Sequence, residues 1–400
     1  MDSFPLGITR NRLYPPRPAT SGPGLPPVSR AIPASIPHLW PLPALVVIAC
    51  APSLESQLWK ATRSTDTIPA YEAFLERYPG GPRSEAARER LQALYEALGR
   101  IESVHVEVRQ SYVHGRADRE IEGLALPVAQ TATALLRQAG LRIARDGAGA
   151  ADGVLGLRLE GRAVSQPYAP VNERNLASTA VTRRYAGAVL RGSVWLSTAG
   201  ERLYDQSFDG RYSPPERIDS ADFPRPEDAP FEAAFDAIVA PELAVMIGRL
   251  YGPGPLVETA MGGSSALRVA AIGALGTLGD STSVQPLRTM LGETANFQLQ
   301  RALVTALGRI GDGRATPDLM EVLRSAFDPA LRASAAEALG RIGGETAVPL
   351  LIEVLSGDAP LVRRQAADAL RSLTGERWGS DAEAWRRWWE SRGSSPAPPP

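Results

Sequence analysis

The tripeptide Ala-Leu-Gly stands at residues 274–276, 306–308 and 338–340, and Ala369-Leu370-Arg371 continues the series. The four alanines are separated by 32, 32 and 31 residues. Residues seven apart lie on the same side of an α-helix, so an aliphatic residue seven positions before each alanine predicts a helix with one apolar face. These aliphatic residues are Leu267, Leu299, Leu331 and Val362. A fixed period of this length is typical of arrays built from helical hairpins.

Helices are predicted to end and restart at matching places in each copy. Gly279, Gly311 and Gly343 follow the first helix, and glycine adopts the left-handed conformation that ends many helices. Each second helix carries an early proline, at 286, 317 and 349, before its apolar stripe. Asp328-Pro329 combines an N-cap residue with a proline suited to the first helical turn. We therefore predict four stacked hairpins between residues 264 and 373, each covering the apolar side of its neighbour.

This register resembles the HEAT family, in particular the short variety found in phycobilisome lyases. The resemblance implies an α-solenoid over residues 256–373, and solenoids present extended surfaces to other proteins. Between residues 265 and 373 there are 11 arginines and 11 acidic residues, whereas a groove that binds a phosphate backbone should be basic. Short HEAT arrays also occur in deoxyhypusine hydroxylase, whose iron is held by His-Glu pairs. No histidine lies beyond His114, which excludes that activity.

The segment after the array is rich in tryptophan. Trp385, Trp388 and Trp389 fall at i, i+3 and i+4, so a helix would carry all three indoles on one side. The last repeat of a solenoid must be covered, so residues 374–393 are predicted to form a cap. An exposed binding patch of indoles is the alternative. Residues 394–400 are expected to be a disordered tail.

Residues 1–43 are dense in proline, and a short apolar run then ends in Cys50, the chain's one cysteine. Val47-Ile48-Ala49-Cys50 resembles the lipobox of bacterial lipoproteins. The resemblance implies that residues 1–50 form a leader ending in a lipoprotein signal, with Cys50 lipidated after cleavage before it. Signal sequences usually have about 15–30 residues, and a start assigned too far upstream would explain why the cysteine stands at position 50. In the alternative interpretation, a disordered tail runs into a buried apolar strand that contains the cysteine.

The lipobox resemblance also implies a location. The apolar run is far shorter than the ~20 residues that a membrane-spanning helix needs, so it favours a lipid anchor instead. Two acyl chains would hold the protein stably at a membrane. The remaining chain would lie on the periplasmic side of a bacterial envelope. By resemblance to enterobacterial sorting, Ala51 in place of aspartate favours the outer membrane.

Residues 53–98 are predicted to be helical. Apolar side chains recur at helical spacing, and Tyr78-Pro79-Gly80-Gly81-Pro82 stops one helix before another begins near Ser84. The string AYEAFLERYP at residues 70–79 resembles a tetratricopeptide-type hairpin of bacterial envelope proteins. About one and a half repeats are present, whereas such repeats normally need three to stand alone. We expect a small helical module that leans on the next domain.

Residues 100–250 are predicted to form an α+β domain. Valines at 104, 106 and 108 and leucines at 155, 157 and 159 alternate with polar residues, as in half-buried strands. Two further strands, 189–197 and 203–208, are joined at Ala199-Gly200-Glu201, and helices follow Pro127 and span 231–247. This order indicates a helical layer against one sheet. Loops 165–185 and 213–229 are long enough to be either functional or disordered.

The residues offer little for chemistry. The formal net charge is −1, and the one lysine, Lys60, has no glycine near it, which excludes a phosphate-binding loop of the Walker type. The only histidines are His38, His105 and His114. The last two are nine apart and would face opposite sides of a strand, so neither a metal site nor a Cys–His pair is predicted. We expect no catalytic residue, cofactor, metal or small-molecule substrate.

Together these patterns predict a multidomain α+β chain: a helical module, a sheet domain and a HEAT solenoid. The expected function is a non-catalytic envelope lipoprotein that acts as a scaffold for protein partners of unknown identity. A HEAT-type enzyme similar to a bilin lyase is the alternative. A third possibility is a structural protein whose sheet domain assembles an envelope complex while the solenoid serves as a spacer.

Overall fold

A computed structural model describes residues 54–113, 120–145, 147–168, 183–213, 229–357 and 359–393. The chain divides into two compact units, Met1–Ala51 and Pro52–Pro400, and every described residue lies in the second. The predicted leader with Cys50, the residue His114 and the tail 394–400 therefore lie outside the described residues. The same is true of most of the two long loops predicted at 165–185 and 213–229.

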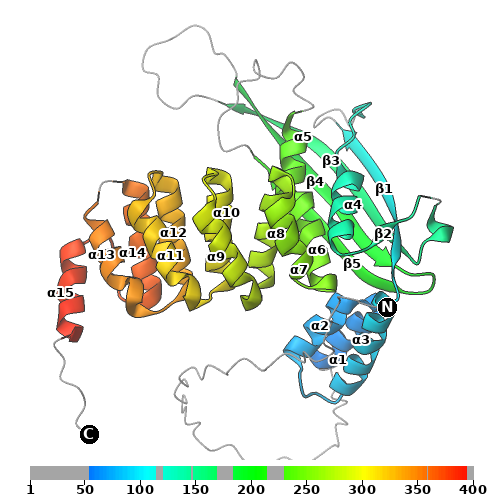
Figure 1. The fold of residues 1–400 in the computed structure, drawn as a ribbon, viewed down its shortest axis with the longest axis horizontal. Helices are drawn as coiled ribbons and strands as arrows, with labels where there is room; N and C mark the ends of the chain where they lie inside the picture. Colours follow the sequence, from blue (N-terminus) through cyan, green and yellow to red (C-terminus); the bar gives the residue numbers. More distant parts are fainter. Residues whose placement is uncertain are drawn as a thin grey trace, which may run out of the picture. The chain divides into compact units, whose positions relative to one another are not determined.

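Three helices form the first part of the described chain: α1 (Leu54–Thr65), α2 (Ile68–Arg77) and α3 (Ser84–Leu98) (Figure 1). Their core is aromatic, with the ring centroids of Trp59 and Phe74 5.1 Å apart. Pro69 lies in the first turn of α2, where its missing N–H has no helical partner to lose. The helical stripes predicted over 53–98 are thus confirmed as helices.

A five-stranded sheet follows, with the strand order β2-β1-β3-β4-β5. The strands are β1 (Ser103–Val113), β2 (Arg142–Ile143), β3 (Gly153–Tyr168), β4 (Arg183–Ser197) and β5 (Arg202–Tyr212). β1 runs parallel to β2 and β3, while β3, β4 and β5 are antiparallel. Helix α4 (Val128–Gln138) lies between β1 and β2 in the chain. The α+β fold and the hairpin at residues 199–201 are as predicted.

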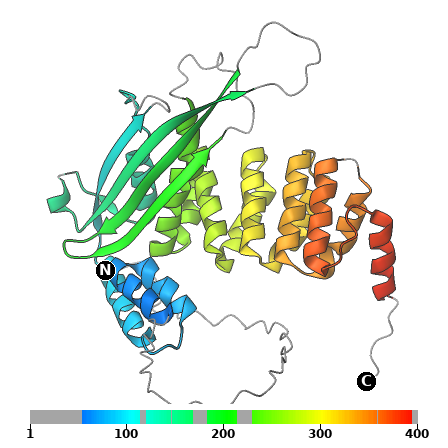
Figure 2. The same cartoon turned by 180° about the vertical axis from the view of Figure 1, so that it is seen from behind.

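Helices cover one face of the sheet. Leu155, Leu157 and Leu159 are buried beneath α4 and the long helix that follows β5, whereas Arg158 and Glu160 on the other face are exposed (Figure 1). Figure 2 shows that other face, over which no helix of the described residues lies. Trp195 lies on it directly against Gly156, where a Cβ atom would meet the indole at 2.1 Å.

The long helix contains a π turn. It comprises α5 (Ala229–Ala234), the π segment η2 (Phe235–Val239) and α6 (Ala240–Tyr251), and the N–H of Ala240 donates to the carbonyl of Phe235, five residues back. Pro241 follows immediately, and in a regular α-helix its ring would clash with the carbonyl four residues before it. The wider turn accommodates the proline without breaking the helix.

The remaining described chain is entirely helical. Its helices are α7 (Gly254–Gly262), α8 (Ser265–Leu278), η3 (Ser281–Ser283), α9 (Val284–Glu293), α10 (Phe297–Ile310), η4 (Gly313–Ala315), α11 (Thr316–Ser325), α12 (Pro329–Ile342), η5 (Glu345–Ala347), α13 (Val348–Leu355), α14 (Pro360–Thr374) and α15 (Ala382–Gly393). Gly279 and Gly311 take the left-handed conformation after α8 and α10, as predicted, whereas Gly343 after α12 has φ 85° and ψ −177°, so the prediction was wrong there.

The number of hairpins differs from the prediction at both ends of the array. Three complete hairpins, α8–α9, α10–α11 and α12–α13, lie within 264–373, and α14 has no second helix there, so the prediction of four was wrong. Gly375 ends α14, and the next helix, α15, begins only at Ala382 and packs on α13. At the other end, α6 packs on α8 as α8 packs on α10, and α7 also packs on α8. The pair α6–α7 is therefore an additional first hairpin.

The repeated tripeptide makes the contact between successive first helices. A Cβ atom on Gly276 would lie 2.8 Å from Cα of Ala306, and one on Gly340 would lie 2.8 Å from Cα of Ala369. Such distances are shorter than van der Waals contact, so only glycine lets the helix backbones approach this closely. The fourth copy has Arg371 in the glycine position, with its side chain more than half exposed and paired with Asp368. Within the described residues no further first helix packs on α14 at this position, so a side chain can be accommodated there.

Candidate interaction surface

The first helices begin at one edge of the array. Gly276 and Ala306 both lie in the last turns of their helices, and equivalent contacts join Gly308 to Ala338 and Gly340 to Ala369. Neighbouring first helices therefore run in the same direction, and their N-terminal ends lie side by side. We call this end the loop edge; it consists of the turns α7–α8, α9–α10, α11–α12 and α13–α14.

Each turn of the loop edge is fastened by the same kind of hydrogen bond. The fourth residue of each first helix donates to a carbonyl in the last turn of the preceding helix or just beyond that helix. The pairs are Arg268 Nε to Ala260 O (2.7 Å), Gln300 Nε2 to Thr294 O (3.0 Å), Arg332 Nε to Leu323 O (3.0 Å) and Arg363 Nη1 to Gly357 O (3.0 Å). Terminal carbonyls lack partners within their own helix, so these bonds satisfy them and hold the turns in place.

Two of the turns also carry side-chain caps. Oδ1 of Asn296 accepts a hydrogen bond from the N–H of Leu299 at 3.1 Å. Oδ1 of Asp328 accepts from the N–H groups of Ala330 (2.7 Å) and Leu331 (3.0 Å), as the Asp-Pro pattern predicted. Caps of this kind each contribute about 1 kcal/mol to helix stability. The turns α9–α10 and α11–α12 are thus held both by these caps and by the bonds to helix-end carbonyls.

Large apolar side chains are exposed along this edge. The exposed fraction is 53% for Met261, 38% for Phe297 and 42% for Leu361, and Phe327 is fully exposed. Each belongs to a different turn: Met261 to α7–α8, Phe297 to α9–α10, Phe327 to α11–α12 and Leu361 to α13–α14. We call these four residues the apolar row. The four residues stand 13, 9, 11 and 8 residues before the repeated alanines, so they share one edge without occupying the same position of the repeat. Several large apolar side chains exposed along one edge are typical of a protein-binding site.

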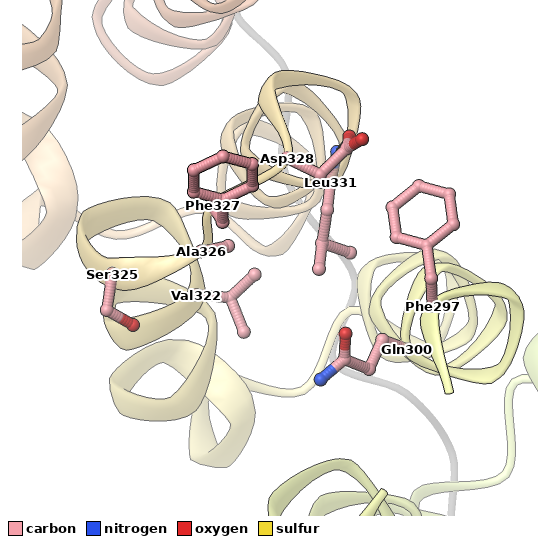
Figure 3. A pocket seen from close by; sticks show the side chains of 8 residues that line it. All are labelled: Phe297, Gln300, Val322, Ser325, Ala326, Phe327, Asp328 and Leu331. Atoms are coloured by element: carbon pink, nitrogen blue, oxygen red, sulfur yellow. Dashed lines mark hydrogen bonds between the residues drawn. The ribbon is translucent and has the colours of Figure 1, made fainter. Parts of the chain in front are cut away.

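A hollow of about 390 Å³ lies between α10, α11 and α12, at the centre of the apolar row. Figure 3 shows the rings of Phe297 and Phe327 on either side of it. Its walls are Phe297, Gln300, Val322, Ser325, Ala326, Phe327, Asp328 and Leu331. Five of the eight lining residues are apolar and three, Gln300, Ser325 and Asp328, are polar, so a group that enters the hollow would meet both kinds of surface.

The predicted tryptophan segment packs against the array. Trp385 is completely buried, and its Nε1 donates to the carbonyl of Gly379 at 3.0 Å. Trp388 meets Trp385 edge-on, with ring centroids 5.6 Å apart. Arg392 pairs with Glu345 at 2.9 Å. The indoles thus serve largely in packing α15 onto the last repeat, as a cap requires.

Arg90 links the helical module to the β4–β5 hairpin. Its guanidinium contacts Asp66 at 2.7 Å and Glu201 at 2.9 Å. The hydrogen bond from Arg90 lowers the pKa of Asp66, although partial burial opposes the shift. Burial and the hydrogen bond to Asp66 raise the pKa of Tyr71 to about 12. This network stabilises the contact between the helical module and the hairpin, because the charge of Arg90 offsets the charges of Asp66 and Glu201.

Two carboxyl groups away from the loop edge also have shifted pKa values. Burial raises the pKa of Asp236 and of Glu242, but both lie on the helix that covers the sheet. His105 lies on β1, and its Nδ1 has no hydrogen-bond partner. The part of the chain that the structure describes contains no group of three or more His, Cys, Asp or Glu residues placed to hold a metal ion. Nor does any described helix have the length and apolarity to cross a membrane.

The apolar row was not predicted from the sequence. The predicted apolar stripe, with Leu299 and Leu331, points into the stack, whereas Phe297 and Phe327 fall outside it at helix starts. A signal was present nonetheless: a large aromatic residue stands within one position of an N-cap, where polar residues are usual. The predicted Cys50 lies outside the described residues, so its place relative to the apolar row is not described.

Comparison with known proteins bears on the C-terminal region. Residues 255–327 and 316–382 match the family of HEAT repeats. No curated protein matches the chain. Among solved structures, the complex of CpcE and CpcF of phycocyanin lyase from Nostoc sp. PCC7120 is similar, at 23% identity over 39% of this chain and with a TM-score of 0.30.

The similar region spans 65% of that lyase chain, and a likeness of this size carries no argument about activity. The comparisons match neither the lipobox nor the tetratricopeptide-like hairpin. The repeat period, the stacked first helices and the family match agree over the same residues. The C-terminal region of this chain is therefore an array of HEAT repeats.

Proposed function

We propose that this protein is a non-catalytic scaffold that binds other proteins along the loop edge of its HEAT array. The apolar row is the observation that carries the proposal. Exposed apolar side chains in contiguous patches are uncommon on proteins without partners. Phenylalanine is also among the residues enriched in protein interfaces relative to the rest of the surface, and two of the four residues in the row are phenylalanines.

The order of the loop edge supports the same proposal. The repeated hydrogen bonds to helix-end carbonyls and the caps at Asn296 and Asp328 hold the row in place before binding. A surface that is already ordered loses little conformational entropy when a partner docks. A HEAT array thereby offers several anchor points on one rigid support.

The proposal includes an anchor and a location. The lipobox resemblance at Val47–Cys50 supports lipidation of Cys50 and attachment on the periplasmic side of a bacterial envelope, with the outer membrane favoured. The tetratricopeptide-like resemblance of residues 70–79 supports a second interaction module. Mass spectrometry of the mature N-terminus tests the anchor, and an intact chain with unmodified Cys50 would remove it without affecting the loop edge.

The docking proposal is tested by photo-crosslinking in cells. A photoreactive phenylalanine analogue in place of Phe327 is expected to crosslink to a discrete partner protein. The further substitution Phe297→Ser should abolish that crosslink, because the two rings flank the same hollow. Leu54→Ser is the matched control, since Leu54 is 71% exposed but lies on α1. Docking at the loop edge is refuted if no crosslink forms or if Phe297→Ser leaves it unchanged.

A further inference from the structure

We infer that the outer edge of β1 binds an extended segment of a partner protein, which adds to the sheet as a further strand. The inference goes beyond the proposed function, because this site lies on the sheet domain and is separate from the loop edge. It is drawn from the unpaired backbone groups of β1, from the side chains beside them and from the regular geometry of the strand.

Within the described residues, β1 has a neighbouring strand along only a short part of its outer side. On its inner side it pairs with β3 from Val104 to Val113. On its outer side β2 pairs only with Ser103 and Val104, and an isolated bridge joins Val113 to Glu120. Between these two pairings no other segment of the described chain is hydrogen-bonded to the backbone of β1. We call residues 106–110 the open edge.

The backbone groups of the open edge point outward. Carbonyls on either side of it accept hydrogen bonds from the flanking segments, and the pairs are Arg142 N–H to Glu102 O (2.9 Å), Ala144 N–H to Val104 O (3.0 Å) and Ile121 N–H to Tyr112 O (2.8 Å). All three acceptors are even-numbered residues, and alternate residues of a strand direct their N–H and C=O groups to the same side. The N–H and C=O groups of Val106, Val108 and Gln110 therefore point outward as well. No described residue supplies a hydrogen-bond partner for any of these groups.

The side chains beside the open edge are apolar and only partly covered. Val106 and Val108 face the side of the sheet covered by helices and are half-buried, whereas the leucines paired with them on β3 are fully buried. Ile143 and Ile121, beside the two ends of the open edge, are also half-buried and pack against the core. A strand with alternating apolar residues would cover the two valines and continue the core between the isoleucines.

An extended peptide matches the open edge in both spacing and polarity. Groups on one side of a strand recur at every second residue, about 6.6 Å apart, and alternate between donors and acceptors. A second strand presents the complementary groups at the same interval. A phosphate-rich surface offers acceptors without donors, so it satisfies only part of the edge. About 26 Å separates Val104 from Tyr112 along the strand, which leaves room for about five residues between the flanking segments.

The open edge is also unprotected against pairing. Edge strands often avoid pairing through a proline, a β-bulge or a charged residue that points inward. Residues 104–112 contain no proline, their register with β3 is continuous, and Glu107 and Arg109 pair with each other on the face opposite the helices. At the other edge of the sheet, by contrast, α2 and α3 contact β5, and the register of β5 with β4 shifts at Ser197. The edge of β1 is therefore the one suited to strand addition.

Peptides selected from a library test the inference. Random nine-residue peptides displayed on phage are selected on the full chain, and the enriched peptides are measured by fluorescence anisotropy. We expect enriched sequences in which apolar and polar residues alternate. Hydrogen exchange should show that the amides of Val106, Val108 and Gln110 become protected when such a peptide is bound.

Val108→Pro is the main test variant. Proline removes one outward N–H, whereas the pairing with β3 uses the N–H groups of the alternate residues and is retained. We expect at least about tenfold weaker binding than to the matched control Val108→Thr, which keeps the N–H and a β-branched side chain. Val106→Lys tests the edge independently by placing a charge among the half-buried apolar side chains, and it should weaken binding by a similar factor. Circular dichroism of each variant checks that it is folded.

The inference is overturned if no enriched peptide binds more weakly to Val108→Pro than to Val108→Thr, or if a bound peptide leaves the three amides unprotected. It is also overturned if Phe327→Ser abolishes peptide binding, because the peptide then occupies the loop edge. A dimer of the chain that Val108→Pro dissociates would overturn it as well, because the occupant is then a second copy. The crosslink at position 327 tests the loop edge separately, so either proposal can fail without the other.

Discussion

The contact between Gly308 and Ala338 allows a sharp test of how the array is held together. Gly308 lies inside α10, and a Cβ atom there would lie 2.6 Å from Cβ and 2.7 Å from Cα of Ala338 in α12. Favourable carbon contacts are about 3.5–4.0 Å, so the substitution Gly308→Ala must push the two helices apart by about 1 Å. The obstructing Cα is a backbone atom, which no rotamer change can move aside.

Two opposing effects set the size of the change. Alanine is favoured over glycine inside a helix by about 1 kcal/mol. Inserting a methyl group into a packed interface costs about 1–3 kcal/mol. Gly273 in α8 supplies the matched control, because a Cβ atom there has no neighbour within 4 Å. Gly273→Ala should therefore stabilise the protein by up to about 1 kcal/mol, and Gly308→Ala should be about 1–3 kcal/mol less stable than Gly273→Ala.

The assay is urea unfolding followed by circular dichroism of the helical signal, with both variants compared with the unmodified chain. The difference between the two alanine variants isolates the packing cost, because both make the same gain in helix propensity. Equal midpoints for Gly308→Ala and Gly273→Ala would show that the first helices do not need glycine for their close approach. The explanation of the repeated tripeptide would then be wrong.

Three further changes have definite expected outcomes. Ser283 is buried with no hydrogen-bond partner for its hydroxyl, while alanine stands at the equivalent positions 315 and 347, so Ser283→Ala should stabilise the chain by about 1 kcal/mol in urea unfolding. The pKa of Asp66 is lowered in the folded protein. The ionised carboxylate therefore stabilises the fold above the unfolded-state pKa, and this stabilisation is lost as pH falls through the folded-state pKa. Asp66→Asn should reduce the dependence of the free energy of unfolding on pH in that acidic range. Trp385→Ala should lower the free energy of unfolding by about 3–5 kcal/mol and expose α13 to proteolysis. Trp378→Ala is the control and should have little effect, because Trp378 is 44% exposed. Equal protease sensitivity of the two variants would argue against α15 as the cover of the array.

Patterns of local spacing predicted much of the fold. The alternating valines of β1 and leucines of β3 are strands, Pro127 precedes α4, and the hairpin at 199–201 joins β4 to β5. Strands and helices have periods of 2 and 3.6 residues, so a buried side of either is visible in the order of apolar residues. Glycine at a helix end is equally local, as Gly279 and Gly311 show.

Other features depend on contacts between distant segments. The hairpin α6–α7 lacks the Ala-Leu-Gly tripeptide, and α6 also packs on α4, so its place in the array emerges only from its contact with α8. The packing of α15 on α13 depends on where α14 ends and on the path of residues 375–381, which bring the chain back to α13. The π turn before Pro241 requires a helix that continues through a proline, which spacing alone does not show.

The sequence by itself determined the HEAT period, the small residues at which first helices meet, and the strands of the sheet, because each is set by neighbours along the chain. Only the tertiary structure decided that Met261, Phe297, Phe327 and Leu361 share one exposed edge. These residues are separated by about a repeat each, and stacking of parallel first helices brings their turns together. The exposed row is thus a property of the stack, and no single repeat contains it.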